Sequence, residues 1–189
     1  FRGEALPSIG AISRLSIASR PRSGETDAHI IRIEGGKKYP PEPTALSGGT
    51  RVEVRDLFFA TPARLKFLKS PQTETSHVKE VIERLSMAYP DISIRLRSEE
   101  RMLFSAQAQT GDLWQARLKR LGDVMGRDFA DNALKIEAQR DSVRLTGYAG
   151  LPTLNRGTSS EQYLFVNGRP VRDKLIIGAV RGAYADFLA

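Results

Sequence analysis

The sequence predicts an α+β protein made of two parts, and three observations support this fold class. Apolar and polar residues alternate in stretches such as 14–19 and 28–34, which is typical of β-strands. Residues 77–90 and 113–126 instead carry apolar residues three or four positions apart, the spacing of an amphipathic α-helix. The polar, glycine-containing segment 108–112 separates a strand pattern from a helix pattern and is the predicted domain boundary. Strand-rich halves with a few long helices predict two α+β sandwiches.

The first part is predicted to contain strands, a loop and one long helix. Two strands lead to a loop rich in proline and glycine at 36–49 and to a third strand pattern at 50–59. A helix over 77–90 ends at its proline, and residues 91–107 are expected to form a hairpin. The apolar positions that share one face of this helix are Val78, Val81, Ile82 and Leu85.

The second part begins with the helix at 113–126. Period-two alternation then predicts strands at 133–138, 142–150 and 162–166, with a polar loop at 152–161 before the last of them. Because the part mixes short strands with helices at both of its ends, it is expected to form a separate sandwich.

The end of the chain carries the strongest turn signal. Asn167 and Gly168 follow an apolar strand, and this dipeptide is typical of two-residue hairpins. Asp173 is a good N-cap for a helix that begins at Lys174. The apolar face that this helix is expected to bury comprises Leu175, Ile176, Ala179, Val180, Ala183 and Phe187.

Composition narrows the function classes. The 189 residues include no cysteine, which excludes disulfides and thiolate metal sites and fits a reducing cytoplasm. His29 and His77 are far apart in sequence, so a histidine metal site is disfavoured. The longest apolar stretches, such as 175–180, are far too short for a membrane span, and we expect no membrane partner. The net charge of +7 suits a polyanionic partner, although many proteins carry such a charge for solubility.

The first six residues suggest either an anion site or an ordinary helix start. Gly3 precedes a helix-like run, and Glu4 suits the positive end of the helix dipole. The free N–H groups of a first helical turn can hold phosphate. Taken alone, the stretch favours a simple capped helix, because the full P-loop spacing is absent.

Three stretches together resemble the MutL branch of the GHKL superfamily of ATPases, which acts in DNA mismatch repair. They are "FRGEAL" at 1–6, "GGTRVEVRDLFFATPARLKFLK" at 48–69 and "QYLFVNGRPVRDKLI" at 162–176, so the resemblance covers nearly the whole chain. The first motif and the Gly-Thr pair also occur in gyrase-type relatives, whereas "DLFFATPAR" narrows the resemblance to this branch. It implies that 1–108 is the C-terminal part of a GHKL (Bergerat-type) ATPase sandwich. It implies that 112–189 is an incomplete α/β sandwich like domain 2 of ribosomal protein S5.

The resemblance also implies which functional groups this chain does not supply. In the family, the general-base glutamate, the asparagine that binds Mg²⁺ and the adenine-binding Asp-x-Gly-x-Gly motif precede the motif at 1–6. We therefore expect a parent protein that uses ATP and Mg²⁺, and an internal fragment that has no catalytic or metal-binding residue and is inactive alone. No cofactor is expected to bind the fragment tightly. At Ala60 the family more often has asparagine, which leaves any role of that position open.

The resemblance places nucleotide contacts at two positions of the first part. A phosphate-binding lid is expected at 1–6, with contacts made largely by backbone N–H groups, and Thr50 is expected beside the adenine-reading aspartate. Thr50 is otherwise an ordinary residue at the start of a strand. The nucleotide-binding candidates are Arg2, Gly3, Glu4, Ala5, Leu6 and Thr50.

Candidate DNA contacts follow from the basic groove of the family and from the end of the chain. Lysine and arginine usually lie on solvated faces without a binding role. Arg84 also has an ordinary explanation, because Glu80 stands four residues before it and can pair with it along a helix. Lys174 is unusual because a cation in the first helical turn faces the positive end of the dipole, at a cost of a few tenths of a kcal/mol. The DNA-binding candidates are Lys66, Lys69, Arg84, Arg169, Arg172 and Lys174.

The leading hypothesis is part of a MutL-type ATPase of the bacterial cytoplasm, acting at the nucleoid. The resemblance implies a homodimer that closes on ATP, a basic groove for DNA, and mismatch-recognition and downstream repair proteins as partners. One alternative is the ATPase region of a type II topoisomerase, which "DLFFATPAR" argues against. The other is a non-enzymatic nucleic-acid-binding module, which the composition permits.

Overall fold

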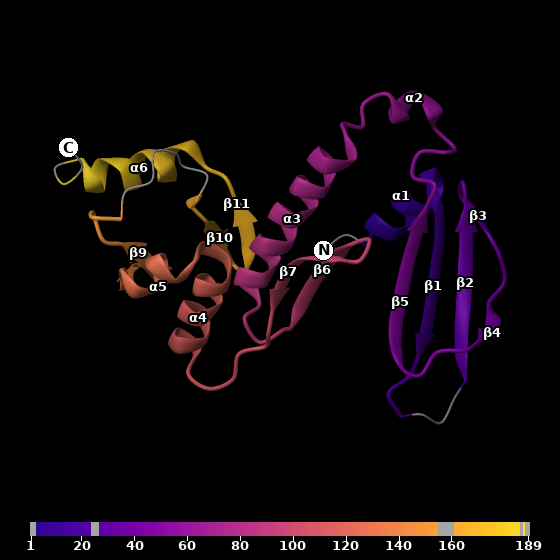
Figure 1. The fold of residues 1–189 in the computed structure, drawn as a ribbon, viewed down its shortest axis with the longest axis horizontal. Coiled ribbons are helices and arrows are strands. Elements are labelled where there is room, and N and C mark those ends of the chain that lie inside the picture. The colour runs from indigo at the N-terminus through magenta and orange to yellow at the C-terminus, as the bar shows by residue number, and fades with distance from the viewer. Residues whose placement is uncertain (1–2, 24–26, 155–160, 186, 188–189) are drawn as a thin grey trace. The chain divides into compact units, whose positions relative to one another are not determined.

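The chain divides after Ser70 into two compact units, Phe1–Ser70 and Pro71–Ala189. A computed structural model describes residues 3–23, 27–154, 161–185 and 187, and Figure 1 shows the fold as a ribbon. The predicted boundary at 108–112 lies within the second unit, in the segment between a hairpin and a helix. The position of the boundary between the two predicted sandwiches therefore stays a prediction.

The first unit is an antiparallel sheet with one helix against it. The strand order is β3-β2-β1-β5, and β4 pairs with β2 beside β3. Helix α1 lies at the end of the sheet where β1 begins and β5 ends (Figure 1). The elements are α1 (Ala5–Ile12), β1 (Arg14–Arg20), β2 (Ala28–Glu34), β3 (Lys37–Lys38), β4 (Glu42–Thr44), β5 (Gly49–Arg55) and α2 (Pro62–Leu65).

The predicted strands at 14–19 and 28–34 are confirmed, the pattern at 50–59 forms a strand only as far as Arg55, and the register of the three strands creates one apolar face. Leu15 of β1 lies between Ile33 of β2 and Val54 of β5, so all three side chains share a face. Helix α1 covers the β2 side, where a Cβ added to Gly10 would lie 2.9 Å from Ile33 Cγ2. Leu15 is therefore 2% exposed, whereas Val54 remains exposed.

In the residues that the structure describes, the second unit joins helices to three separate antiparallel hairpins, β6–β7, β8–β9 and β10–β11. Its core lies where the end of α3 meets β7 and α4, and it includes the buried side chains of Met87, Phe104 and Ala116. The elements are α3 (Pro71–Ala88), β6 (Ile94–Ser98), β7 (Arg101–Ala106), α4 (Leu113–Met125), α5 (Arg127–Asp131), β8 (Ala133–Arg140), β9 (Val143–Gly150), β10 (Leu164–Val166), β11 (Arg169–Val171) and α6 (Lys174–Tyr184).

Local turn and cap signals of this unit are confirmed. Asn167 and Gly168 both have positive φ, 49° and 76°, as a type I′ turn between β10 and β11 requires. Asp173 caps α6 by accepting a hydrogen bond from the N–H of Ile176 at 2.9 Å. Asp112 caps α4 in the same way, with the N–H groups of Trp114 and Gln115 as donors.

The predicted buried face of α6 is wrong for the described residues. Leu175 is 83% exposed and Phe187 is 69% exposed. The half-buried positions are Ile177, Val180 and Tyr184, because the Tyr184 hydroxyl donates to the carbonyl of Gly150 at 2.6 Å and sets the rotation of the helix. Helix α3 shows the same pattern, since its apolar face at 78–85 is largely exposed while Ser86 and Met87 are buried.

Candidate functional sites

The start of α1 has the geometry of an anion-binding helix end. Gly3 adopts a φ of 69°, which favours glycine, and leads directly into the helix. The Glu4 side chain makes no cap hydrogen bond, and the first residues of the helix are exposed. The N–H groups of Ala5 and Leu6 have no helical partner by geometry, so they are available to a ligand. Arg2, the remaining candidate here, lies outside the described residues.

Thr50 lies at the opposite end of the sheet. It pairs with Ser19 of β1, and the two hydroxyl oxygens are 2.9 Å apart. Five residue steps separate Ser19 from Arg14, the residue that begins β1 next to α1, which corresponds to about 17 Å at about 3.4 Å per residue. The structure therefore places Thr50 at the end of the sheet away from Arg14, the residue that follows the end of α1. An extended nucleotide also has its base and its terminal phosphate at opposite ends.

The segment "DLFFATPAR" contacts the end of α1, and two of its residues have a left-handed backbone conformation. Asp56 and Phe58 have φ values of 50° and 70°, and such conformations in non-glycine residues cluster at functional sites. The N–H of Phe58 donates to the carbonyl of Ile12, the last residue of α1, at 2.8 Å. Arg14 adds an ion pair with Asp56 at 3.0 Å. This loop therefore holds the end of the helix whose start is the candidate phosphate site.

The two phenylalanine rings of that segment each lie against an arginine side chain. The Arg14 guanidinium lies 4.8 Å from the ring centroid of Phe59, and the Arg64 guanidinium lies 5.2 Å from that of Phe58. Phe67, by contrast, is 83% exposed. Lys66 and Lys69 are also exposed, on the same unit.

Two DNA-binding candidates of the second unit meet at one carboxylate. Glu80 Oε1 on α3 accepts a hydrogen bond from Arg84 Nη2 at 2.5 Å and another from Arg172 Nη2. The hydrogen bond from Arg84, together with the charges of both arginines, lowers the pKa of Glu80 below its ordinary value. Burial raises the pKa of Tyr163, whose ring centroid lies 5.9 Å from the Arg84 guanidinium.

Arg172 and the two remaining DNA-binding candidates of this unit, Arg169 and Lys174, lie beside the hairpin and the start of α6. Arg169 begins β11, Arg172 follows that strand, and Lys174 is the first residue of α6. Arg169 and Lys174 are exposed, and the side chain of Arg172 is 71% exposed. The structure thus brings these cations to one short segment, and the Asp173 carboxylate among them is engaged as the cap.

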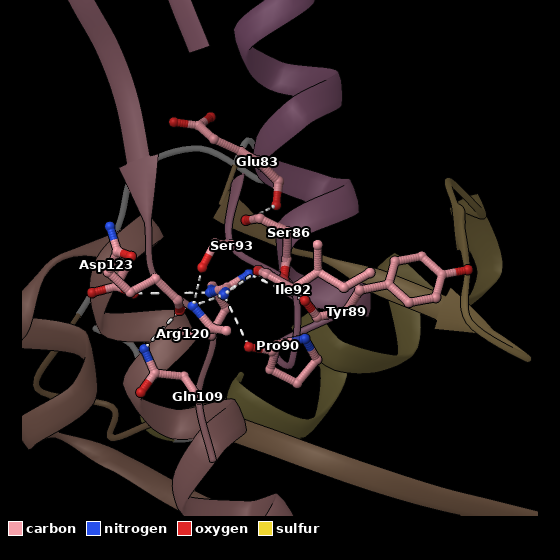
Figure 2. A network of polar contacts seen from close by, with 11 residues as sticks. Glu83, Ser86, Tyr89, Pro90, Ile92, Ser93, Gln109, Arg120 and Asp123 are labelled. Atoms are coloured by element: carbon pink, nitrogen blue, oxygen red, sulfur yellow. Dashed lines mark hydrogen bonds and ion pairs between the residues drawn. The ribbon is translucent and has the colours of Figure 1, made fainter. Parts of the chain in front are cut away.

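A buried arginine that sequence reasoning missed organises the core of the second unit. Figure 2 shows Arg120 of α4 among main-chain carbonyls at the end of α3 and the turn after it. The side chain is 0% exposed, and burial lowers its pKa. A signal was present, because Arg120 stands four residues after the buried Ala116 on the inward face of an amphipathic helix. The acceptors of its Nη1 and Nη2 groups are the carbonyls of Ser86, Tyr89, Pro90, Ile92 and Gln107, at 2.6–3.3 Å.

Metal and membrane features are not found in the described part of the chain. Within residues 3–23, 27–154, 161–185 and 187, no group of three or more histidine or acidic side chains is placed to hold a metal ion. Among the helices of those same residues, none combines the length and the apolar character that crossing a membrane requires.

Comparison with solved structures defines the class of protein. The chain superposes on the "Aquifex aeolicus MutL ATPase domain complexed with ADP" with a TM-score of 0.77 at 29% identity, covering 95% of this chain and 67% of that one. It matches the "N terminal domain of a DNA repair protein" with the same TM-score at 21% identity, covering 99% of this chain and 60% of that one. The fold is that of GHKL-type ATPase domains of MutL, so the predicted fold class is confirmed.

Sequence comparison gives the family. Residues 121–189 match the family described as "DNA mismatch repair protein, C-terminal domain". DNA mismatch repair protein MutL of Rhodospirillum rubrum is 58% identical over the whole chain, and that of Paramagnetospirillum magneticum is 59% identical. The chain belongs to the MutL family of DNA mismatch repair proteins. It spans 30% and 31% of the length of these two relatives.

Proposed function

We propose that this chain forms part of the ATPase region of a longer mismatch repair protein, in which ATP binding closes a homodimer and hydrolysis releases it. The exposed start of α1, with its uncapped N–H groups behind Gly3, is the observation that carries the proposal. Two comparisons support it, because the matched relatives are about three times as long and one solved neighbour is an ATPase domain complexed with ADP.

Each end of the first unit has a distinct role in this proposal. The N–H groups of Ala5 and Leu6 bind phosphate oxygens, and the positive φ of Gly3 lets the chain approach the ligand closely. The hydroxyl of Thr50 lies on the base side of the nucleotide, where Ser19 orients it. The loop at 56–61 holds α1 in place through the hydrogen bond from Phe58 to Ile12.

The chemistry of hydrolysis is assigned to residues outside this chain. Bound Mg²⁺ would neutralise phosphate charge, and the described residues include no cluster of three or more acidic or histidine side chains to hold it. No step is therefore assigned to the metal here. The 189 residues alone are expected to hydrolyse no ATP and to bind no nucleotide tightly, and magnesium-dependent phosphate release that survives repurification would contradict this.

The second unit is proposed to contact DNA of any sequence through its exposed cations. Arg169, Arg172 and Lys174 form this surface, which we call the basic corner. Phosphate contacts of this kind carry affinity without sequence information. The bacterial cytoplasm, mismatch-recognition proteins and downstream repair proteins complete the proposed setting.

Calorimetric titration of the full-length protein with a non-hydrolysable ATP analogue tests the nucleotide site. Gly3→Ala is expected to weaken binding about tenfold, because alanine at positive φ costs roughly 1–2 kcal/mol. Gly178→Ala is the matched control, since its added Cβ would meet nothing within 4 Å. Equal affinity for both variants, with wild-type circular dichroism, would show that the helix start is not the phosphate site.

The alternatives make different predictions in the same titration. A nucleic-acid-binding module without nucleotide chemistry would show no heat with the analogue in the full-length protein. A type II topoisomerase would bind the analogue, but the relatives above 50% identity over this chain are mismatch repair proteins. That identity and the "DLFFATPAR" segment favour the mismatch repair assignment.

A further inference from the structure

Glu80 holds two arginines of the second unit with one carboxylate oxygen. Arg84 reaches it from the next turn of α3, with 2.5 Å between Nη2 and Oε1. Arg172 reaches the same oxygen from the segment between β11 and α6, although it stands 92 positions away in sequence. This arrangement ties the basic corner to α3 through a side chain that no motif singled out.

The two arginines differ in how free they are to leave. The Arg84 side chain is 17% exposed and is fixed on a second side, since its guanidinium stands over the ring of Tyr163. The Arg172 side chain is 71% exposed. Arg172 is therefore the partner that can turn toward another anion, while Arg84 stays with Glu80.

Carboxylate and phosphate oxygens are interchangeable partners of a guanidinium group, since both accept paired, charge-assisted hydrogen bonds. We propose that Glu80 competes with DNA phosphate for Arg172 and thereby sets how tightly the basic corner binds DNA. The inference rests on the proposed DNA contact of that corner. Without DNA, Glu80 neutralises Arg172. With DNA, the Arg172 guanidinium pairs with phosphate, and Arg84 remains to neutralise Glu80.

The retained Arg84 explains why such an exchange is feasible. A carboxylate left without a partner would repel the incoming phosphate, whereas one still bonded to Arg84 repels it much less. Exposed ion pairs contribute little, so competition of this kind modulates affinity about two- to fivefold rather than switching binding on and off.

The test uses the full-length protein and a fluorescent DNA duplex of arbitrary sequence at low salt. Glu80→Gln is expected to tighten binding about two- to fivefold, and in the Arg172→Gln background the same change is expected to give no gain. Glu74→Gln is the matched control, because it removes the same charge from the same helix.

The outcomes separate this inference from the function on which it rests. Equal gains in DNA affinity from Glu80→Gln and Glu74→Gln would mean that the loss of one negative charge explains the effect, and would overturn the inference. A gain that persists without Arg172 would overturn it as well. Wild-type protein that binds DNA, with no change on Glu80→Gln, would overturn the inference alone. Wild-type protein that binds no duplex at any salt concentration would overturn the proposed DNA contact together with it.

Discussion

The guanidinium group of Arg120 is fully buried, whereas that of Arg172 is largely exposed. Arg120 donates to main-chain carbonyls at the end of α3, in the turn after it and at the end of β7 (Figure 2). Arg172 is bonded to the one carboxylate of Glu80. Both residues link α3 to a later part of the second unit, but they do so with different kinds of acceptor.

The difference teaches what burial does to a charged group. A buried guanidinium has lost its hydration, so it is stable only where several dipoles replace water, and the carbonyls at a helix C-terminus are suited to this. Arg120 meets this condition with two of its three nitrogens, while its Nε lies 3.8 Å from Asp123. An exposed guanidinium keeps its hydration and adds little stability, but it remains accessible to a ligand. We therefore expect Arg120 to support the fold and Arg172 to support binding.

Removing the buried group is expected to give the largest effect. Arg120→Met leaves several buried carbonyls without donors, so opening of the surrounding structure is expected to become easier by about 3–5 kcal/mol. Hydrogen–deuterium exchange of the full-length protein would show faster exchange at 86–92 and 107–109. Arg140→Met, at an exposed arginine of the same unit, is the control and is expected to change opening by less than about 0.5 kcal/mol.

Arg120→Lys sharpens the same comparison. A lysine ammonium has three donors and no planar fork, so it cannot serve carbonyls on both sides as the guanidinium does. The loss of free energy of local opening in Arg120→Lys is expected to lie between the losses in Arg120→Met and in the control Arg140→Met. Exchange rates of Arg120→Lys equal to wild type would mean that charge, rather than hydrogen-bond geometry, holds this region together.

Charge reversal in the exposed region is expected to spare the fold and weaken DNA binding. Lys174→Glu places an anion in the first turn of α6, which is expected to stabilise that helix by a few tenths of a kcal/mol. DNA affinity is nevertheless expected to fall, and the slope of log K against log salt to decrease by about one phosphate contact or more. Salt-dependent anisotropy measurements check this, with Lys119→Glu on the exposed side of α4 as the control. Equal losses in both variants would remove Lys174 from the binding surface.

The smallest expected effect is on the titration of Glu80. Its pKa in the folded chain is lowered below the ordinary value of 4.5, with the hydrogen bond from Arg84 as the largest cause. Because the folded pKa is depressed, the ion pairs are fully formed above the ordinary pKa and are lost as the pH falls through the lowered value. Carboxyl NMR should show a larger upward shift in Arg84→Gln than in Arg172→Gln. The reverse order would mean that Arg172 is the stronger partner.

Sequence reasoning identified the local structure and the family, but not the contacts that hold the second unit together. The alternation at 14–19 and 28–34, the Asn167–Gly168 turn and the Asp173 cap are confirmed, because each depends on neighbours in the chain. The buried face of α6 was wrong, since apolar spacing shows which residues share a face but not which face meets a partner. The predicted DNA and nucleotide contacts stay predictions.

The sequence by itself determined the strands, the hairpin, the helix cap at Asp173 and the likeness to the MutL family. Only the tertiary structure decided that Arg120 is buried and that Glu80, which the helical spacing already pairs with Arg84, also binds Arg172. The acceptors of Arg120 are main-chain carbonyls, which every residue carries, so no side-chain pattern marks them in advance. Arg172 meets Glu80 across 92 positions of chain, and a contact over that separation exists only after the helices and hairpins have packed.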